Sequence, residues 1–227
     1  MKKSHIVLAI LALLIITLIV IAAVVYFLTG SLPWRKKQEN PNDMPITEKP
    51  AIYLYPTEET DINVILDYDG TLDTTYPEYN GGWEVTAFPD GKIINHADGR
   101  EYSYLFWEGR GTADYDFYSG FIVSCDDTIS FLQDKLAYLG LTPAEYNEFI
   151  VYWLPKLQRS PYNLITFQGE SYTETAKLTI TPEPDSILRV FMAYKPLEEP
   201  ISLPEQELMP FERQGFTVVE WGGCEVE

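Results

Sequence analysis

Apolar residues near the start of the chain form one continuous run, whereas later segments alternate with a period of two or of about 3.6. The stretch from Ile6 to Leu28 has only two polar interruptions, Thr17 and Tyr26, and no charge. As a helix it reaches about 35 Å, enough to cross a ~30 Å hydrocarbon layer. The alternative, a cleavable signal peptide, has an apolar core of only ~7–15 residues. We therefore expect an uncleaved transmembrane helix within residues 1–30.

The flanks of this run are nearly balanced in positive charge, because Lys2 and Lys3 on one side face the basic residues 35–37 on the other. From residue 50 onward the chain has 10 Lys and Arg against 31 Asp and Glu. Anionic headgroups of the cytoplasmic leaflet repel such an acidic domain. We therefore predict a single-pass protein of the cell membrane, in contact with lipid through its helix, whose domain lies outside the cytoplasm.

The remaining chain is predicted to hold a linker and one folded domain. Residues 31–50 contain four prolines and no apolar periodicity, which is typical of an irregular linker. Residues 51–227 form the domain. Its first half alternates in short strands with Asp-Gly turns at Asp69, Asp90 and Asp98, the pattern of an antiparallel meander. Within it, Glu101–Trp107 is expected to be one long aromatic strand.

The middle of the domain changes to a helical period. Ile129, Leu132, Leu136 and Leu139 recur at steps of three and four, which predicts a helix ended by Gly140. A second helix begins at once, with Thr142 as cap, Pro143 at the first position, Glu145 completing a capping box, and Pro155 expected as its end. Further strands follow at 163–167, 176–181, 187–194 and 215–221. The predicted fold class is α+β, mostly antiparallel β with an embedded αα-hairpin and one N-terminal transmembrane helix.

Composition excludes several classes of function. A net charge of −18 disfavours binding to phosphate backbones, so nucleic acid is not an expected partner. With 46% apolar residues the chain is not a disordered acidic tail. Its two cysteines, Cys125 and Cys224, leave open one disulfide or two free thiols. The single histidine of the domain, His96, has no metal-ligand spacing around it. An acidic calcium loop at Asp67–Asp73 fails because Leu72 occupies the glycine position.

Three sequence strings resemble an uncharacterised bacterial family of membrane-anchored or secreted proteins. They are KPAIYLYP at Lys49–Pro56, YWLP at Tyr152–Pro155 and VEWGG at Val219–Gly223. The resemblance spans residues 49–223 and implies one domain rather than two. It implies no activity, cofactor or catalytic residue.

A second string is similar to the first motif of haloacid-dehalogenase-type phosphatases. The apolar strand 64–66 is followed by Asp67-Tyr68-Asp69-Gly70-Thr71. By that likeness Asp67 is the nucleophile and Asp69 the acid and base, with Mg²⁺ held by carboxylates. Such enzymes need a helical crossover to each parallel neighbour, and residues 71–108 offer only turns and strands. We therefore prefer a hairpin turn at Asp69-Gly70 and expect neither cofactor nor metal.

Tryptophan–carboxylate neighbours at two predicted strand ends are the preferred binding candidates. Trp107-Glu108 and Glu220-Trp221 provide an aromatic ring and an acceptor for a sugar, with Tyr104 on the same expected strand as Trp107. The same glutamates suit glycoside hydrolysis if their carboxyl groups lie ~5–9.5 Å apart. Ordinary core tryptophans beside solvated glutamates are the other interpretation. The hypothesis is a non-enzymatic binding domain for a glycan or an envelope protein, with the Mg²⁺-dependent phosphatase and the glycan hydrolase as alternatives.

Overall fold

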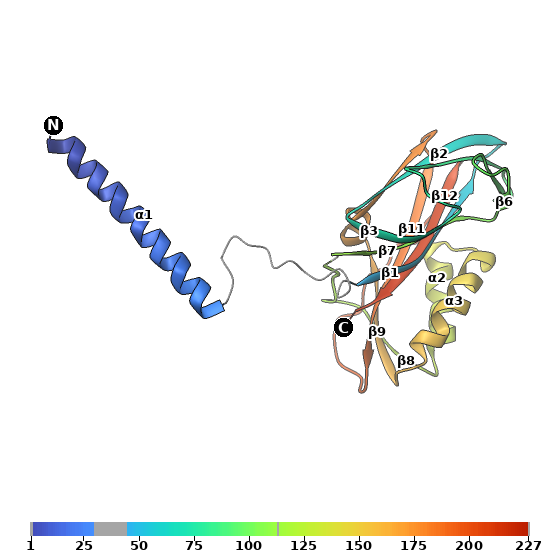
Figure 1. The fold of residues 1–227 in the computed structure, drawn as a ribbon. Coiled ribbons are helices and arrows are strands. Elements are labelled where there is room, and N and C mark those ends of the chain that lie inside the picture. Colours follow the sequence, from blue (N-terminus) through green and yellow to red (C-terminus); the bar gives the residue numbers. More distant parts are fainter. Residues whose placement is uncertain (1, 30–44, 113, 227) are drawn as a thin grey trace. The chain divides into compact units, whose positions relative to one another are not determined.

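The computed structural model describes residues 2–29, 45–112 and 114–226, in two units over residues 1–40 and 41–227. The first unit contains helix α1 (Lys2–Thr29), and the second contains every other described element (Figure 1). Residues 30–44, most of the predicted linker, lie outside the described residues. The last part of that predicted linker is structured, because strand β1 begins at Ile46.

Helix α1 forms where the apolar run predicted a helix, but the transmembrane assignment is corrected. No helix among the described residues combines the length and the hydropathy that a membrane crossing needs. The described fold is a β-rich α+β domain with few helices, and the predicted transmembrane helix is not supported among the described residues.

The strands of the second unit form two sheets. The large sheet has seven strands in the order β3-β7-β1-β12-β11-β9-β8, and the small sheet has five in the order β10-β2-β4-β5-β6. The large sheet consists of β1 (Ile46–Tyr55), β3 (Gly70–Tyr76), β7 (Leu105–Gly111), β8 (Phe121–Ser124), β9 (Tyr162–Gln168), β11 (Ser186–Leu197) and β12 (Thr217–Glu225). The small sheet consists of β2 (Thr60–Tyr68), β4 (Trp83–Ala87), β5 (Ile93–Asn95), β6 (Glu101–Tyr102) and β10 (Ala176–Thr181). The described helices of this unit are α2 (Thr128–Leu139), α3 (Pro143–Leu157) and the short α4 (Glu170–Thr173).

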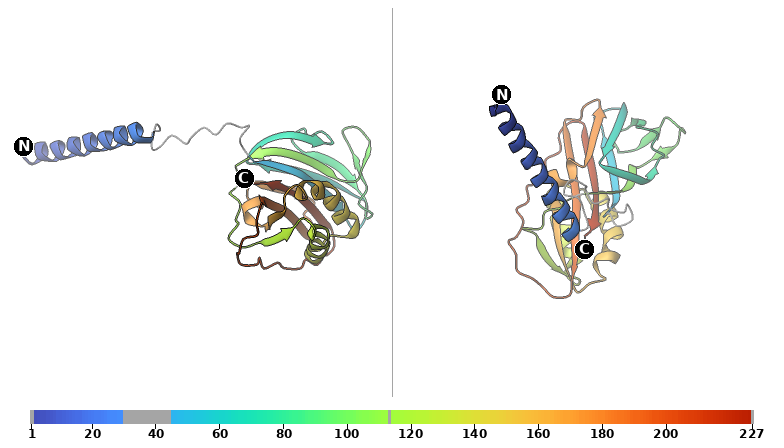
Figure 2. Two further views of the ribbon diagram at one scale, coloured as in Figure 1. Left: turned by 90° about the horizontal axis from the view of Figure 1, so that it is seen from below. Right: turned by 60° about the vertical axis from the view of Figure 1, so that its left-hand side comes forward.

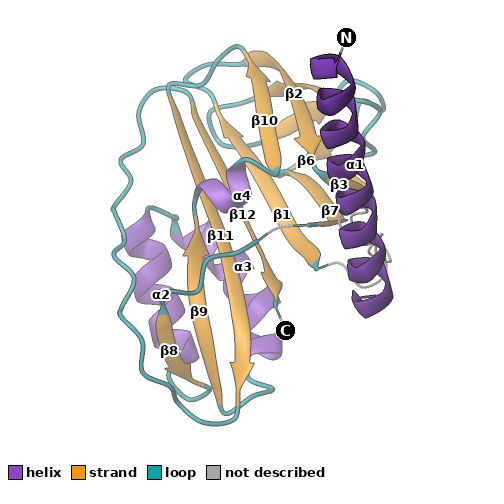
Figure 3. Ribbon diagram, turned by 90° about the vertical axis from the view of Figure 1, so that its left-hand side faces the viewer, coloured by secondary structure: helices purple, strands orange, loops and turns teal. Residues whose placement is uncertain are grey.

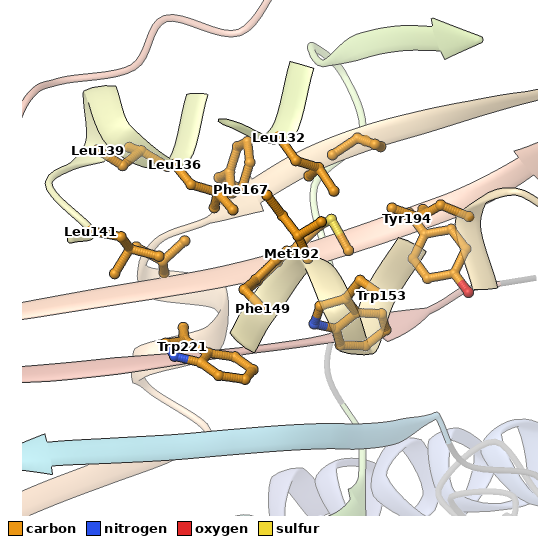
Figure 4. Packing of buried hydrophobic residues seen from close by; sticks show 14 of the residues in the cluster. Leu132, Leu136, Leu139, Leu141, Phe149, Trp153, Phe167, Met192, Tyr194 and Trp221 are labelled. Atoms are coloured by element: carbon orange, nitrogen blue, oxygen red, sulfur yellow. The ribbon is translucent and has the colours of Figure 1, made fainter. Parts of the chain in front are cut away.

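Alternation along the central strands of the large sheet produces a core on each of its faces. On β1, Tyr53 packs into one cluster with α2 and α3, whereas Ile52 and Leu54 pack into another with the small sheet. The helix pair and the small sheet therefore cover opposite faces of the large sheet (Figures 2 and 3). Trp153 and Phe149 of α3 meet Trp221 of β12 in the helix-side core (Figure 4).

Strand β11 is covered on both faces, as its apolar run predicted. Phe191 and Met192 are both fully buried, in opposite cores. Its ladder with β12 is parallel, and every other ladder between described strands is antiparallel. The prediction of a mostly antiparallel sheet with an embedded helix pair is thus confirmed for the described part of the domain.

Two features predicted for the first half of the domain are wrong. In both places the chain passes from one sheet to the other. β2 lies in the small sheet and β3 in the large one, so Asp69-Gly70 is a crossing point rather than a hairpin. Gly70 is required there because a Cβ would lie 2.2 Å from the Arg110 carbonyl oxygen. The expected aromatic strand Glu101–Trp107 is likewise divided between β6 and β7.

The other turn and cap predictions divide into confirmed and corrected ones. The turns at Gly91 (φ 88°) and Gly99 (φ 68°) join β4, β5 and β6, and Gly140 caps α2 in the left-handed conformation. Pro155 lies inside α3 rather than ending it. Its missing N–H leaves free the carbonyl of Val151, whose side chain is 75% exposed on the solvent side. β12 likewise continues through Gly222-Gly223 to Glu225 instead of ending there.

Candidate functional site

Strand β1 carries an irregularity at its start that holds one half-buried lysine in a strained conformation. Pairing with β12 shifts register between Glu48 and Ala51, and pairing with β7 shifts between Thr47 and Ala51. Lys49 has φ 59°, and it is the one non-glycine residue of the described segments with positive φ. A β-bulge with such a backbone costs free energy and persists when its surroundings enforce it. Strain of this kind concentrates at functional sites.

Substitution of Lys49 tests the backbone strain directly. Both Lys49→Gly and Lys49→Ala remove the ammonium, but only glycine adopts positive φ without steric cost. We expect Lys49→Gly to be more stable than Lys49→Ala by about 1 kcal/mol. The free energies of unfolding from urea titration measure this difference. An alanine variant as stable as the glycine variant would show that the bulge is not strained.

The three strings that stand out in the sequence meet at this bulge. A Cβ on Gly222 would lie 3.0 Å from Pro50 Cα, and one on Gly223 would lie 2.8 Å from the Trp153 ring. KPAIYLYP, YWLP and VEWGG therefore supply the bulge, the helix that covers it and the glycines that allow its close approach. The glycines serve packing, which explains why they do not end β12.

The Lys49 ammonium lies over aromatic rings of the large sheet. Its Nζ is 4.7 Å from the ring centroid of Tyr104, 5.1 Å from that of Phe106 and 5.7 Å from that of Trp221. Lys49 Nζ also donates a hydrogen bond of 3.2 Å to the Tyr104 hydroxyl. Cation–π contacts of this kind are worth ~0.5–2 kcal/mol, depending on their desolvation. The strained backbone thus places a cation in an aromatic environment.

Two carboxylates lie next to Lys49, namely Glu48 on β1 itself and Glu108 on the neighbouring strand β7. Glu108 of β7 accepts a hydrogen bond of 3.3 Å from the Lys49 backbone N–H. Glu48 accepts one of 2.8 Å from the Tyr152 hydroxyl and forms an ion pair with Lys156. The pKa of Glu108 is raised, mainly by burial and in part by the nearby negative charge of Glu48. The hydrogen bond from the Lys49 N–H acts in the opposite direction but does not cancel this effect. The pKa of Tyr152 is raised mainly by burial and also by the charges of Glu48 and Glu108. Both carboxylates are therefore close to the Tyr152 hydroxyl.

The raised pKa of Glu108 gives a pH dependence of stability with a defined sign. The folded state favours the protonated carboxyl, so this stabilisation is complete below the ordinary carboxyl pKa and is lost as the pH rises through the raised value. Glu108→Gln removes this loss. The stability of that variant relative to wild type should therefore increase from pH 4 toward pH 8. Urea titrations at several pH values measure it, with the exposed Glu84→Gln as control, and a constant difference would contradict it.

An open pocket lies beside Lys49, against the middle turns of α3. Lys49, Asn147, Glu148, Val151 and Tyr152 line it, and its volume is about 520 Å³. The Tyr53 hydroxyl donates a hydrogen bond of 3.0 Å to Glu148 and fixes the polar wall. The pocket combines an aromatic ring, an amide, a carboxylate and an ammonium around one depression. These groups donate and accept hydrogen bonds to a polar ligand while the ring and Val151 contact an apolar face.

The structure brings together three of the five predicted binding residues. Tyr104, Glu108 and Trp221 all lie at Lys49, although Trp221 is fully buried. Trp107 and Glu220 are buried on the opposite face, where Trp107 Nε1 donates a 3.2 Å hydrogen bond to Glu220. Neither tryptophan can stack on a sugar, because neither is exposed.

The predicted pair of catalytic glutamates, Glu108 and Glu220, is wrong. On β12 the side chains of Val219 and Trp221 enter the helix-side core, so Glu220 between them faces the small sheet. On β7 the side chain of Trp107 faces the small sheet, so Glu108 beside it faces the helices. Two carboxylates on opposite faces of one sheet do not flank one glycosidic bond.

The structural premise of the phosphatase alternative is also absent. Both neighbours of β2, the strand that carries Asp67, run antiparallel to it. Asp67 and Asp69 are exposed, and Asp69 begins the passage into the large sheet. No group of three or more acidic, histidine or cysteine side chains suited to a metal ion occurs among the described residues. Asp67 and Asp69 therefore belong to a structural crossing.

The disulfide alternative for the two cysteines is resolved. Cys125 and Cys224 are both free thiols. Cys224 is fully buried between the sheets, and burial raises its pKa above the ordinary thiol range. A reactive-thiol role for Cys224 is therefore disfavoured.

Sequence reasoning missed the residues that build the pocket, namely Glu48, Lys49, Asn147, Glu148, Tyr152 and Lys156. Lys49 and Tyr152 appeared only as letters of the three strings, and Glu48 and Lys49 lay inside the predicted linker. A residue before proline is normally extended, so nothing in the sequence predicts positive φ at Lys49. The usable signal was the occurrence of all three strings in one domain, which indicates that they lie close together in the fold.

Comparison with known proteins finds that part of the chain is similar to an uncharacterised protein. No family model and no solved structure matches the chain. It is 55% identical over 64 residues to a protein of Butyrivibrio fibrisolvens described as "Uncharacterized protein in bglA 3'region". The alignment covers 27% of this chain and 65% of that relative's length. The fold and the site together define a β-rich α+β domain with one strained, pocket-forming bulge, and the relative's description adds no activity.

Proposed function

We propose that this domain binds a glycan in the pocket beside Lys49. The observation that carries the proposal is the lining of the pocket, in which Tyr152, Asn147, Glu148 and Lys49 border one open volume of about 520 Å³. Sugar rings offer an apolar face for aromatic stacking and hydroxyl groups that both donate and accept hydrogen bonds. The lining provides partners for each of these features.

The charge of the site favours a neutral glycan over an anionic one. Glu48, Glu108 and Glu148 outnumber Lys49 and Lys156, and the Lys156 ammonium is already paired with Glu48. A carboxylate or phosphate ligand would meet this excess of negative charge, whereas neutral hydroxyl groups would accept from Lys49 and donate to Glu148. An envelope protein as ligand is less favoured, since the pocket holds a group of small-molecule size. The extracytoplasmic location expected from the sequence stays a prediction.

Calorimetric titration of the full chain tests the proposal. The probes are soluble gluco-, xylo-, manno- and chito-tetrasaccharides. For the tetrasaccharide that wild type binds, Asn147→Ala should lower the affinity about tenfold, the equivalent of ~1.4 kcal/mol. Because Asn147 is exposed, the same substitution should leave the free energy of unfolding unchanged.

The matched control is Gln133→Ala, which removes an exposed amide from α2 instead of α3. It should bind like wild type. The proposal fails if wild type binds none of the four probes, or if Asn147→Ala and Gln133→Ala bind alike.

A further inference from the structure

We propose that the glycan bound beside Lys49 carries acetamido groups, as N-acetylglucosamine does, and that one of these groups is recognised on the surface of α3. This inference rests on the proposed function, since it names the class of sugar that the same pocket takes. It depends on three side chains of the pocket lining, those of Asn147, Glu148 and Val151. An acetamido group presents an N–H donor, a carbonyl acceptor and a methyl group, and the three side chains offer one partner for each.

The first argument is the placement of the three side chains on one surface of the helix. Within α3, Val151 follows Asn147 by four residues and Glu148 by three. Residues at these spacings are neighbours on a helix, with Cβ atoms about 5–6 Å apart. Asn147 and Glu148 therefore both adjoin Val151, and all three line the same pocket. A planar group of the size of an amide contacts all three at once.

The second argument is the hydrogen-bonding capacity of the two polar side chains. Glu148 is exposed, and its carboxylate accepts a hydrogen bond of 3.0 Å from the hydroxyl of the buried Tyr53. An ionised carboxylate is only an acceptor and takes more than one donor, so it suits the acetamido N–H. Asn147 is exposed as well, and its side-chain amide donates to the acetamido carbonyl oxygen. The Tyr53 hydroxyl holds the Glu148 carboxylate in position for this contact.

The third argument is the exposed apolar side chain between them. Val151 is 75% exposed, whereas its chain neighbours Phe149, Ile150 and Trp153 are buried. Val151 therefore adds little to the core, and its methyl groups face water. The methyl group of an acetamido substituent removes this apolar surface from water, which favours binding. The valine thus matches the part of the ligand that the two polar side chains leave unpaired.

Other substituents at the same position of the sugar ring match fewer of these side chains. A hydroxyl group exchanges hydrogen bonds with Glu148 or Asn147 but has no apolar part to cover Val151. An ammonium group pairs with Glu148, but it shares the pocket with the positive charge of Lys49 and brings a hydrated charge to Val151. The acetamido group is the substituent that satisfies the whole triangle.

Calorimetric titration of the full chain with three tetrasaccharides tests this inference. The chito-, cello- and fully deacetylated chito-tetrasaccharides share one backbone and carry acetamido, hydroxyl and ammonium groups, respectively, at the same ring position. Wild type should bind the acetylated probe at least ~10-fold more tightly than either of the other two. Val151→Thr keeps the shape of the side chain but replaces one methyl group by a hydroxyl group. It should lower the affinity for the acetylated probe about fourfold.

The matched control is Ile129→Thr, which makes an exposed apolar position of α2 polar and should bind like wild type. The outcomes separate this inference from the proposed function. A smaller preference than expected, or tighter binding of either non-acetylated probe, would overturn the acetamido assignment and leave the glycan-binding proposal intact. Equal affinities of Val151→Thr and Ile129→Thr for the acetylated probe would also overturn it. Absence of binding to every probe, including the xylo- and manno-tetrasaccharides, would defeat both proposals.

Discussion

Replacing Arg189 by methionine should lower the free energy of unfolding by about 3–5 kcal/mol. Arg189 Nε donates a 2.6 Å hydrogen bond to Glu220, and the two side chains are only 10% and 1% exposed. Without the guanidinium, Glu220 is a charge buried between the sheets that still accepts a hydrogen bond from Trp107 Nε1. Burial lowers the pKa of Arg189, but Glu220 and Tyr172 raise it by a larger amount. The net shift of the pKa is upward, so the folded state favours the charged form.

A second substitution distinguishes loss of a partner from loss of packing. Arg189→Met/Glu220→Leu removes both charges and keeps apolar volume at each position. The double variant should recover most of the stability that Arg189→Met loses, since no unpaired charge remains. Urea titrations of wild type, the two single variants and the double variant complete the cycle. A double variant that loses the sum of the two single losses would show that the pair is not coupled.

Arg213→Ala should destabilise the domain by about 3 kcal/mol. Arg213 lies in the long segment between β11 and β12 and donates hydrogen bonds to Glu145 and to the Gly140 carbonyl oxygen at 2.9 Å. The Glu145 side chain has no exposed area, although it also accepts from Tyr55 and the Thr142 N–H. Arg213 is 26% exposed, so partial screening places this loss below that of Arg189→Met.

Lys135→Ala is the matched control for this prediction. Lys135 joins the same segment to α2 through Glu205, whose side chain is 73% exposed, whereas that of Glu145 is fully buried. Its removal should change stability by less than about 0.5 kcal/mol in the same urea titration. Equal effects of Arg213→Ala and Lys135→Ala would indicate that burial of Glu145 does not determine the cost.

Local patterns predicted the elements of the domain better than their assembly. The helix pair follows from the spacing of Leu132, Leu136 and Leu139 and from the cap at Gly140, all of which act within a few residues. The crossings near Gly70 and Tyr104 were missed, because alternation is the same whether a strand pairs with its neighbour in sequence or enters another sheet. Pairing partners depend on contacts between distant segments.

The candidate site shows the same division. Tyr104, Glu108 and Trp221 were predicted from the chemistry of aromatic–carboxylate neighbours and do meet at Lys49. Glu220 was assigned to the wrong face, because the face of a strand residue is fixed only when the register of its sheet is known. The bulge that shapes the pocket depends on Pro50, Gly222 and Trp153, which come from three distant segments.

The most direct test of the account is an amide chemical-shift map of the full chain titrated with the tetrasaccharide that binds most tightly. The account predicts that the largest shifts occur at Lys49, Tyr104, Glu108 and Tyr152, around the bulge of β1 and the middle turns of α3. Shifts confined to the outer face of the small sheet, at Asn63, Glu84 and His96, which line pockets of their own, would contradict it.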